Sequence, residues 1–588
     1  MNRKVLKRLL GGCIAGMMAF AVAGCGGSDS GSSGDIYEMS YWIPAGIDNA
    51  MYGSYEENPV VQYIENNYEF NGKPIHFEYY VAPAGSESDN FTTLLSTGEY
   101  CDIMNLSMSS QTPAQLYGED ILADLTDLVP EYMPNYMAFI AEHPELEQNL
   151  YSLVDGEKKI LHITGFRDGI TPNYEGFSYR RDWVAKYGKN PETGAAFTYG
   201  FENPDDPYSW QDDVVFPSGS DEPIYISDWE WMFEIFDQAM ADLGITDGYC
   251  YAPYYQGYMQ TGDFASAFGG GGVCYWYRNS DNVAVFGPTT DNFRAYVQCL
   301  NTWYGKGWVD PAFAEHNSDI FYAVDTAKVF SGKVGLWQGR QSAVGTQIDD
   351  GSDFTSGAVV YGCRQPINDV YGGPESQNVE PYVFLQNSMV GNSIGVTTNL
   401  SEDEIIAFLE YTDFLFSEEG SALALGLNAE QQQSAQNEFY NNLGLSDGAI
   451  VVENGEYRYT NPNLTQEEKN AVGLSCVGGR LEITENLDYG YDRYVQQATD
   501  EWDYYKAGTS LFDSSVQNAI SVEDGATVTN VRTNVDQFMV RSVSAMIMGN
   551  AYDVWDDASW EQFCTDINKF QPDMVTDIYN NAIQAISN

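Results

Sequence analysis

The feature that most constrains the fold is an alternation of strand and helix patterns over residues 36–106. Residue composition predicts strands at 36–43, 75–81 and 102–106, and apolar spacing predicts helices at 58–68 and 86–95. Such alternation is typical of a parallel sheet with crossover helices, so the sequence predicts an α/β fold. The carboxyl ends of the first and third strands, where ligands of open α/β sheets gather, carry Tyr41, Trp42, Asn105 and Ser107.

Further along the chain, three helix starts fit the capping box, in which side chains satisfy free backbone amides. They begin at Ser227, Ser401 and Thr465. The apolar stripe after Ser227 ends at Gly244 and predicts a core helix, and residues 291–304 repeat the pattern.

The N-terminus has the pattern of an export signal. Residues 1–8 are basic, and residues 9–23 are apolar but shorter than the ~20 residues that span a bilayer. Cys25 follows small residues, which resembles the lipobox of bacterial lipoproteins; the alternative is a plain secretory signal. The resemblance implies that residues 1–24 are removed and that Cys25 is lipidated. With the Gly- and Ser-rich residues of 25–35 as a tether, the body would be held at the outer face of the cell membrane.

The charge balance excludes several partners. The chain has 27 Lys and Arg against 85 Asp and Glu, a formal net charge of −58. Such a surface repels nucleic acid and anionic lipid, and it argues against polyanionic ligands. We therefore expect no nucleic-acid partner and no membrane contact other than the lipid anchor.

Cysteine and histidine spacing gives no metal or redox motif. No CxxC or HExxH is present, so we expect neither a metal centre nor a cofactor. Seven cysteines follow Cys25, an odd number that leaves at least one free thiol, and one or two disulfides remain possible. The acidic loop at 205–213 lacks the spacing of a calcium loop, and we interpret it as solvated.

Catalytic motifs are equally weak. Residues 391–395 match the GxSxG nucleophile elbow, but strand-forming residues follow and no histidine occurs after His316. We therefore expect no enzyme. Acidic residues are so numerous that the sequence does not exclude a pair of catalytic carboxylates for glycoside hydrolysis. A surface glycoside hydrolase is therefore an alternative.

Aromatic residues are the abundant candidates for ligand contact. The chain has 12 Trp and 43 Tyr, and several lie beside glycine or polar residues at strand ends: Tyr41, Trp42, Trp276 and Trp337. Aromatic faces stack on the apolar faces of sugar rings, while polar side chains bond the hydroxyls. Trp337 precedes Gln-Gly-Arg340, a polar turn, so we predict that its ring faces the ligand; the alternative is a core tryptophan.

Dispersed segments carry a family resemblance. The most specific are Trp303-Tyr-Gly-Lys-Gly-Trp-Val-Asp-Pro311 and Phe330-Ser-Gly-Lys-Val-Gly335, with further matches at 91–104, 118–128, 179–183, 417–420 and 548–560. In these segments the chain resembles the extracellular solute-binding proteins of family 1, lipoproteins that serve carbohydrate ABC importers in Gram-positive gut bacteria.

The resemblance implies a two-lobed, periplasmic-binding-protein-like α/β fold with an interlobe cleft and crossing hinge strands near 163–179 and 388–398. Lobe one would hold residues 36–170 plus about 390–425, and lobe two residues 171–389 plus much of 426–588.

The resemblance also implies the site and the function. Trp337 matches the position of a stacking aromatic, and Glu175 in the first crossing and Arg340 would bond ligand hydroxyls. A monomer would capture an oligosaccharide by closing its lobes and deliver it to ABC transporter permease subunits without breaking a bond. Another solute, such as a peptide, is the main alternative.

Overall fold

The computed structural model describes residues 36–45, 51, 54–200, 205, 208–253, 264–269, 275–279, 281–315, 324, 326–347, 357–381, 389–475, 477–505 and 514–587. Cys25, the predicted tether and the predicted export signal lie outside these residues. Within them, no helix is both long enough and apolar enough to cross a membrane.

The first sheet confirms the predicted alternation of strands and helices. Its six strands run in the order β16-β6-β13-β3-β1-β2, and β1 pairs in parallel with both β2 and β3. The strands are β1 (Tyr37–Ile43), β2 (Ile75–Val81), β3 (Ile103–Asn105), β6 (Ile163–Arg167), β13 (Val390–Val396) and β16 (Leu481–Glu482). Helices α1 (Pro59–Asn67) and α2 (Glu87–Thr97) form the crossovers between the parallel strands.

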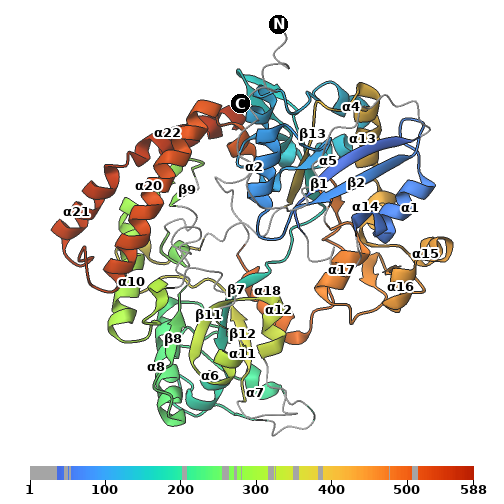
Figure 1. Ribbon diagram of the computed structural model, residues 1–588. Coiled ribbons are helices and arrows are strands. Elements are labelled where there is room, and N and C mark those ends of the chain that lie inside the picture. The colour runs from blue at the N-terminus through green and yellow to red at the C-terminus, as the bar shows by residue number, and fades with distance from the viewer. Residues whose placement is uncertain are drawn as a thin grey trace, which may run out of the picture.

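The second sheet has four strands in the order β12-β7-β11-β8. They are β7 (Glu175–Arg180), β8 (Tyr249–Ala252), β11 (Val334–Arg340) and β12 (Val360–Cys363). Helices α8 (Ile226–Leu243) and α10 (Asp291–Gly305) share the large core around this sheet, as their apolar spacing predicts. Figure 1 shows the two sheets in separate lobes, one above the other.

The predicted helix starts are confirmed at two of three positions. Ser401 and Thr465 form the expected capping boxes of α13 (Glu402–Phe414) and α17 (Gln466–Val472). The prediction for Ser227 is wrong, because α8 begins two residues earlier than that cap implies and Tyr225 is its cap. The Ser227 hydroxyl instead donates to Asp369 Oδ2 at 2.6 Å.

Three segments connect the lobes. Residues 168–174 lead from β6 to β7, residues 364–389 lead from β12 to β13, and residues 483–492 lead from β16 to α18 (Arg493–Trp502). The first lies within the crossing predicted at 163–179. The second precedes β13, which occupies most of the range predicted for it, 388–398, and the third was not predicted. Because β6 leaves the first sheet at its carboxyl end and β1, β2 and β3 run parallel to it, all four carboxyl ends face the second lobe.

The expected division of the C-terminal part differs from the structure. Residues 427–477 contribute to the core of lobe one, and β16 extends its sheet. Only from α18 onward does the chain join lobe two, because α18 lies against β7 and β12. The helices α20 (Val522–Ile547), α21 (Asp557–Asn568) and α22 (Pro572–Ser587) pack into the same core as α10.

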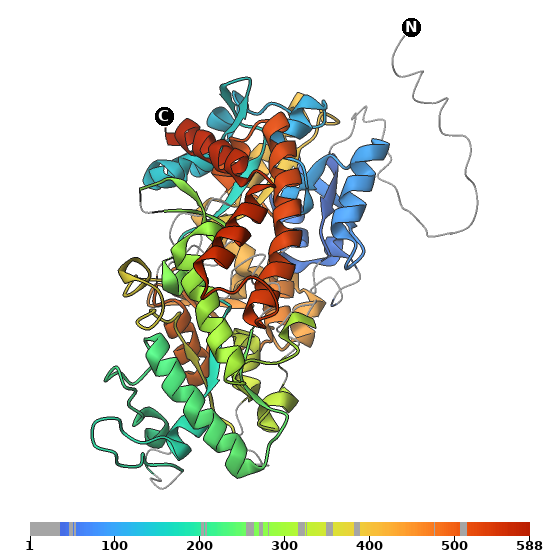
Figure 2. The same ribbon diagram turned by 90° about the vertical axis from the view of Figure 1, so that its left-hand side faces the viewer.

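The C-terminal helices also reach lobe one. Ala585 and Ile586 of α22 line a small apolar hollow with Tyr151 and Leu153 of lobe one, and Asn518 lies 3.4 Å from the ring of buried His162. These helices therefore lie alongside both lobes (Figures 1 and 2).

Four free thiols in the described part of the chain belong to lobe two. Cys250, Cys299 and Cys363 are buried, and Cys564 on α21 is half-buried. Burial raises the pKa of all four thiols. The predicted free thiol is thus confirmed.

Candidate functional site

The strand ends of the two lobes face one another. β7 enters the second sheet from lobe one, and β11 and β12 run antiparallel to it, so their carboxyl ends point back toward lobe one. Glu175 at the start of β7 and Arg340 at the end of β11 are cross-strand partners, and both are half-buried. Ser107 is exposed just beyond β3 on the opposite lobe. These three predicted residues therefore lie at the facing edges.

The first and third crossing segments are bound to each other. Asp168 Oδ1 accepts hydrogen bonds from the backbone amides of Thr484 at 2.6 Å and Glu485 at 3.0 Å. At the other end of the first segment, the Asn173 amide donates to Asp503 Oδ1, just after α18, at 2.8 Å, and its side chain donates to the carbonyl of Trp502, the last residue of α18, at 2.8 Å. The two segments thus form one joint between the lobes.

Two arginines share one carboxylate beside this joint. Arg167 Nε lies 2.9 Å from Glu482 Oε2, and Arg480 Nη2 lies 3.1 Å from Glu482 Oε1. Both oxygens of Glu482 are engaged, which leaves the cluster with a net positive charge in a strongly acidic chain.

Tyr41 and Trp42 are not at the site, which corrects the prediction. Tyr41 is fully buried and stacks on Tyr79 at 5.6 Å between ring centroids. Trp42 is 1% exposed, contacts Phe91 of α2 edge-on and donates from Nε1 to Asn90. Both rings join the sheet to the elements that pack on it, because alternate residues of a covered parallel sheet are buried on both faces.

Trp276 and Trp337 are also core residues. Trp276 is fully buried, and its Nε1 donates to Thr576 of α22 at 3.0 Å. Trp337 is 0% exposed and packs in a core cluster with Tyr249, Val329 and Val360. The prediction that its ring faces the ligand is therefore wrong, and the core alternative holds.

Asn105 is likewise buried and has a local structural role. Its side-chain oxygen accepts from the Ser107 amide at 3.0 Å, which fixes the turn after β3. Only Ser107 of this pair presents a side chain to solvent.

Two exposed tyrosines beside the joint escaped sequence reasoning. Tyr174 is 48% exposed immediately before Glu175, and Tyr504 is 56% exposed just after α18. The guanidinium of Arg364, at the end of β12, lies 3.5 Å from the centroid of the Tyr504 ring and forms a two-point ion pair with Glu501. In the sequence, the two tyrosines are distinguished only by their position next to a crossing segment. They can therefore be identified only after the crossing segments have been located.

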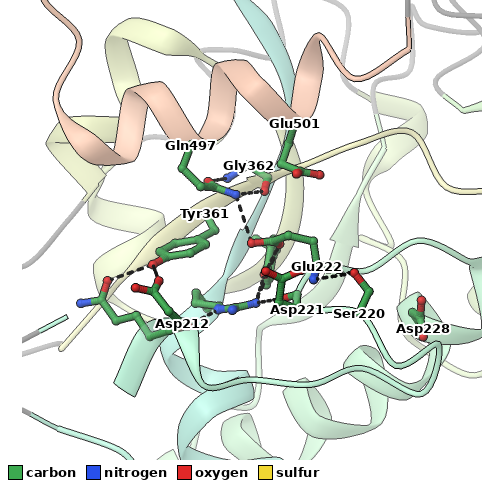
Figure 3. A network of polar contacts seen from close by, with 12 residues as sticks. Asp212, Ser220, Asp221, Glu222, Asp228, Tyr361, Gly362, Gln497 and Glu501 are labelled. Carbon is green, nitrogen blue, oxygen red and sulfur yellow. Dashed lines mark hydrogen bonds and ion pairs between the residues drawn. The ribbon is translucent and has the colours of Figure 1, made fainter. Parts of the chain in front are cut away.

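Helix α18 is fixed to the second sheet by a polar network (Figure 3). The Gln497 amide pairs with the backbone of Gly362, accepting from its N–H and donating to its C=O, both at 2.9 Å. Gln497 Nε2 also lies 3.2 Å from Glu222 Oε1. Because β12 is an edge strand, these bonds occupy backbone groups that would otherwise be unpaired.

Glu222 lies at the centre of the network. Tyr179 donates to its Oε2 at 2.8 Å, and Arg181 Nη1 lies 3.8 Å away. Burial raises the pKa of Glu222 to about 8, and the positive charge of Arg181 opposes the rise. Glu222 lies in the body of lobe two rather than at the facing edges.

No group of three His, Cys, Asp or Glu residues in the described ranges could hold a metal ion. In the loop predicted to be solvated, Asp212 pairs with Arg493 at 3.1 Å and accepts from Tyr361 at 2.7 Å. Residues 391–395, the GxSxG match, lie inside β13, and the next helix starts only at Glu402.

Comparison with known proteins identifies the architecture. No protein-family model matches the sequence, and no curated protein does. An extracellular solute-binding protein from Bifidobacterium longum subsp. infantis superposes with a TM-score of 0.65 at 12% identity, over 94% of this chain and 99% of that one. An HMO-binding, ABC-transporter-associated solute-binding protein from B. longum infantis gives 0.64 at 13% identity, over 94% and 98%. The S. pneumoniae ABC-transporter substrate-binding protein FusA in complex with kestose gives 0.62 at 13%, over 93% and 99%. The chain therefore has the two-lobed fold of these proteins.

Proposed function

We propose that the protein is an exported solute-binding protein that captures an oligosaccharide between its lobes and delivers it to an ABC transporter permease. One observation carries the proposal: the carboxyl ends of both sheets face each other across three connecting segments, in a fold shared along nearly the whole chain with solute-binding proteins. FusA is described with kestose bound, and the second relative as HMO-binding, which favours a carbohydrate over a peptide.

Residues at the facing edges have the chemistry that a sugar needs. Tyr174 and Tyr504 offer exposed aromatic faces, and Glu175, Arg340 and Ser107 offer groups that bond hydroxyls. A ligand that touches both lobes favours the closed arrangement to the extent that it binds that arrangement more tightly. The closed form would then dock on the permease.

The membrane anchor belongs to the proposal as well. Cys25 follows the small residues of a lipobox-like sequence, and a lipid there would hold the protein at the outer face of the membrane. Mass spectrometry of membrane-extracted protein should find Cys25 modified, and Cys25→Ala should release the protein; unmodified Cys25 in the membrane fraction would refute the anchor.

Binding and turnover can be measured together. Calorimetric titration with a panel of oligosaccharides that includes kestose should give a micromolar or tighter complex, about −8 kcal/mol or better. After a day of incubation, chromatography should return the bound sugar intact. Product that increases with protein concentration would support the hydrolase alternative, and binding of peptides but not sugars would replace the ligand class.

A further inference from the structure

A pocket lies beside the joint between the lobes. It has a volume of about 170 Å³ and is lined by the first crossing, the third crossing and the body of lobe one. Thr171 and Tyr489 come from the crossings, whereas Lys469 of α17 and Arg480 come from lobe one. A pocket of this size has room for several ordered waters or one small ion.

Several hydrogen-bond acceptors in its walls are already occupied. Both oxygens of Glu482 pair with arginines. The end of α14 (Glu418–Leu425) presents the Ala424 carbonyl, which accepts from the Leu474 amide at 2.8 Å. The Asn470 side-chain oxygen accepts from Gln466 at 2.9 Å, and its carbonyl accepts from Ser475.

Several donors in the same walls lack partners. The hydroxyls of Thr171 and Tyr489 are buried, and neither forms a hydrogen bond within the described residues. Arg480 uses Nε and Nη2 but makes no bond through Nη1 in this part of the chain. Buried polar groups without partners are destabilising, so a ligand that supplies acceptors would stabilise the pocket.

Lys469 adds an uncompensated charge. Its Nζ donates to the Tyr489 carbonyl at 3.0 Å and lies 5.3 Å from the centroid of the Tyr459 ring, but no carboxylate of the described residues forms an ion pair with it. The acid whose charge acts on it, Asp488, is paired with Arg458 at 3.2 Å. Burial lowers the pKa of Lys469, as expected for a lysine without a counter-ion.

We propose that this pocket binds a small oxyanion, held by Lys469 and Arg480 and by the hydroxyls of Thr171 and Tyr489. Only acceptors are needed from the ligand, and a negative charge balances Lys469. A water would satisfy the hydroxyls but not the charge. The ligand would join the two crossing segments to the body of lobe one at the joint between the lobes.

The test measures thermal unfolding of the sugar-free protein in Tris buffer while chloride is replaced by phosphate, sulfate or acetate at constant ionic strength. We expect a saturable rise in melting temperature with at least one oxyanion. Phosphate and sulfate without acetate would identify a tetrahedral ligand, and acetate alone a carboxylate.

Variants localise the effect. Lys469→Met should weaken the anion affinity by about tenfold or more, as loss of a charge-assisted bond predicts. Tyr489→Phe removes one oxygen, so it should keep the fold and weaken affinity less. Lys333→Met is the matched control, since it removes a lysine of lobe two that is paired with Asp247, and it should respond like wild type.

The proposal is overturned if none of the three anions differs from chloride, or if Lys469→Met and Tyr489→Phe both respond as wild type does. Because no sugar is present, either result leaves the proposed solute-binding function untouched.

Discussion

The two sheets achieve packing by opposite means. In the first, neighbouring strands present large rings, such as Tyr41 and Phe77, which meet Phe408 of α13 at 6.3 and 6.0 Å between centroids. In the second, glycines let a helix approach the strands. A Cβ on Gly176 would lie 2.3 Å from Trp502, and one on Gly362 would lie 2.5 Å from Ala498, both on α18. At these contacts, rings fill the space between sheet and helix in lobe one, whereas glycines let α18 approach the sheet of lobe two.

This difference explains why the tryptophan prediction failed. An aromatic residue among glycines suggests a ligand platform, and Trp337 stands between Gly335 and Gly339. A Cβ on Gly335 would come within 2.1 Å of Phe236 on α8. The neighbouring glycine therefore serves close packing of the core, and the tryptophan is part of that core.

The largest expected effect tests this assignment. Trp337→Ala should lower the free energy of unfolding by ~3–5 kcal/mol, because a fully buried ring is lost and a cavity remains. Chemical denaturation followed by circular dichroism measures the loss. Trp555→Ala, which truncates a tryptophan that is 54% exposed, is the control and should cost far less. Equal losses for the two variants would contradict the core assignment.

The next largest effect is a pH dependence of stability that arises in lobe two. The pKa of Glu222 is raised from its ordinary 4.5 to about 8, so its contribution to stability is fully present below about pH 4.5 and is lost as the pH rises through 8. The loss between pH 5 and 8 is roughly 2–4 kcal/mol.

Glu222→Gln mimics the protonated acid and should flatten that pH dependence in urea titrations. Glu145→Gln, an exposed acid of lobe one, should leave it as in wild type. A wild-type slope retained by Glu222→Gln would show that another group titrates.

A smaller effect tests the close approach of α18. Gly176→Ala forces Trp502 to move and should cost ~1–3 kcal/mol, the range for an overpacked core. Gly118→Ala is the matched control, because its Cβ would meet nothing within 4 Å. If thermal unfolding shows the same loss of stability for both variants, α18 does not lie as close to β7 as described.

The smallest effect concerns ligand contact at the joint. Tyr504→Ala should weaken oligosaccharide affinity by ~0.5–1.5 kcal/mol, the value of one aromatic contact, and spare the melting temperature because the ring is exposed. Tyr208→Ala, which removes another exposed tyrosine that stacks on an arginine, is the control. Affinity unchanged by Tyr504→Ala would remove this ring from the site.

Local sequence patterns predicted the strands, helices and helix caps, because these depend on near neighbours in the sequence. The strands and helices of residues 36–106 were located from periodicity, and the caps at Ser401 and Thr465 from a spacing of three residues. The resemblance supplied the two lobes. The third crossing was missed because β16 is only two residues long, too short for any period.

The site was less predictable because exposure depends on distant contacts. Trp276 is buried by α22, whose Thr576 lies 300 residues further along the chain, and no local pattern encodes that contact. Glu175 and Arg340 were placed at the edge through the resemblance, and their cross-strand pairing is consistent with it. Tyr174 and Tyr504 become candidates only once the crossings are known.

The distribution of thiols gives a practical consequence. Cys250, Cys299 and Cys363 are buried in lobe two with raised pKa values, so an alkylating reagent should reach them only when that lobe opens. Peptide mapping of alkylated cysteines over time would therefore report the rate at which lobe two alone unfolds, without an added label. Comparison of those rates with and without bound solute would show whether capture between the lobes slows unfolding of the lobe that carries α18.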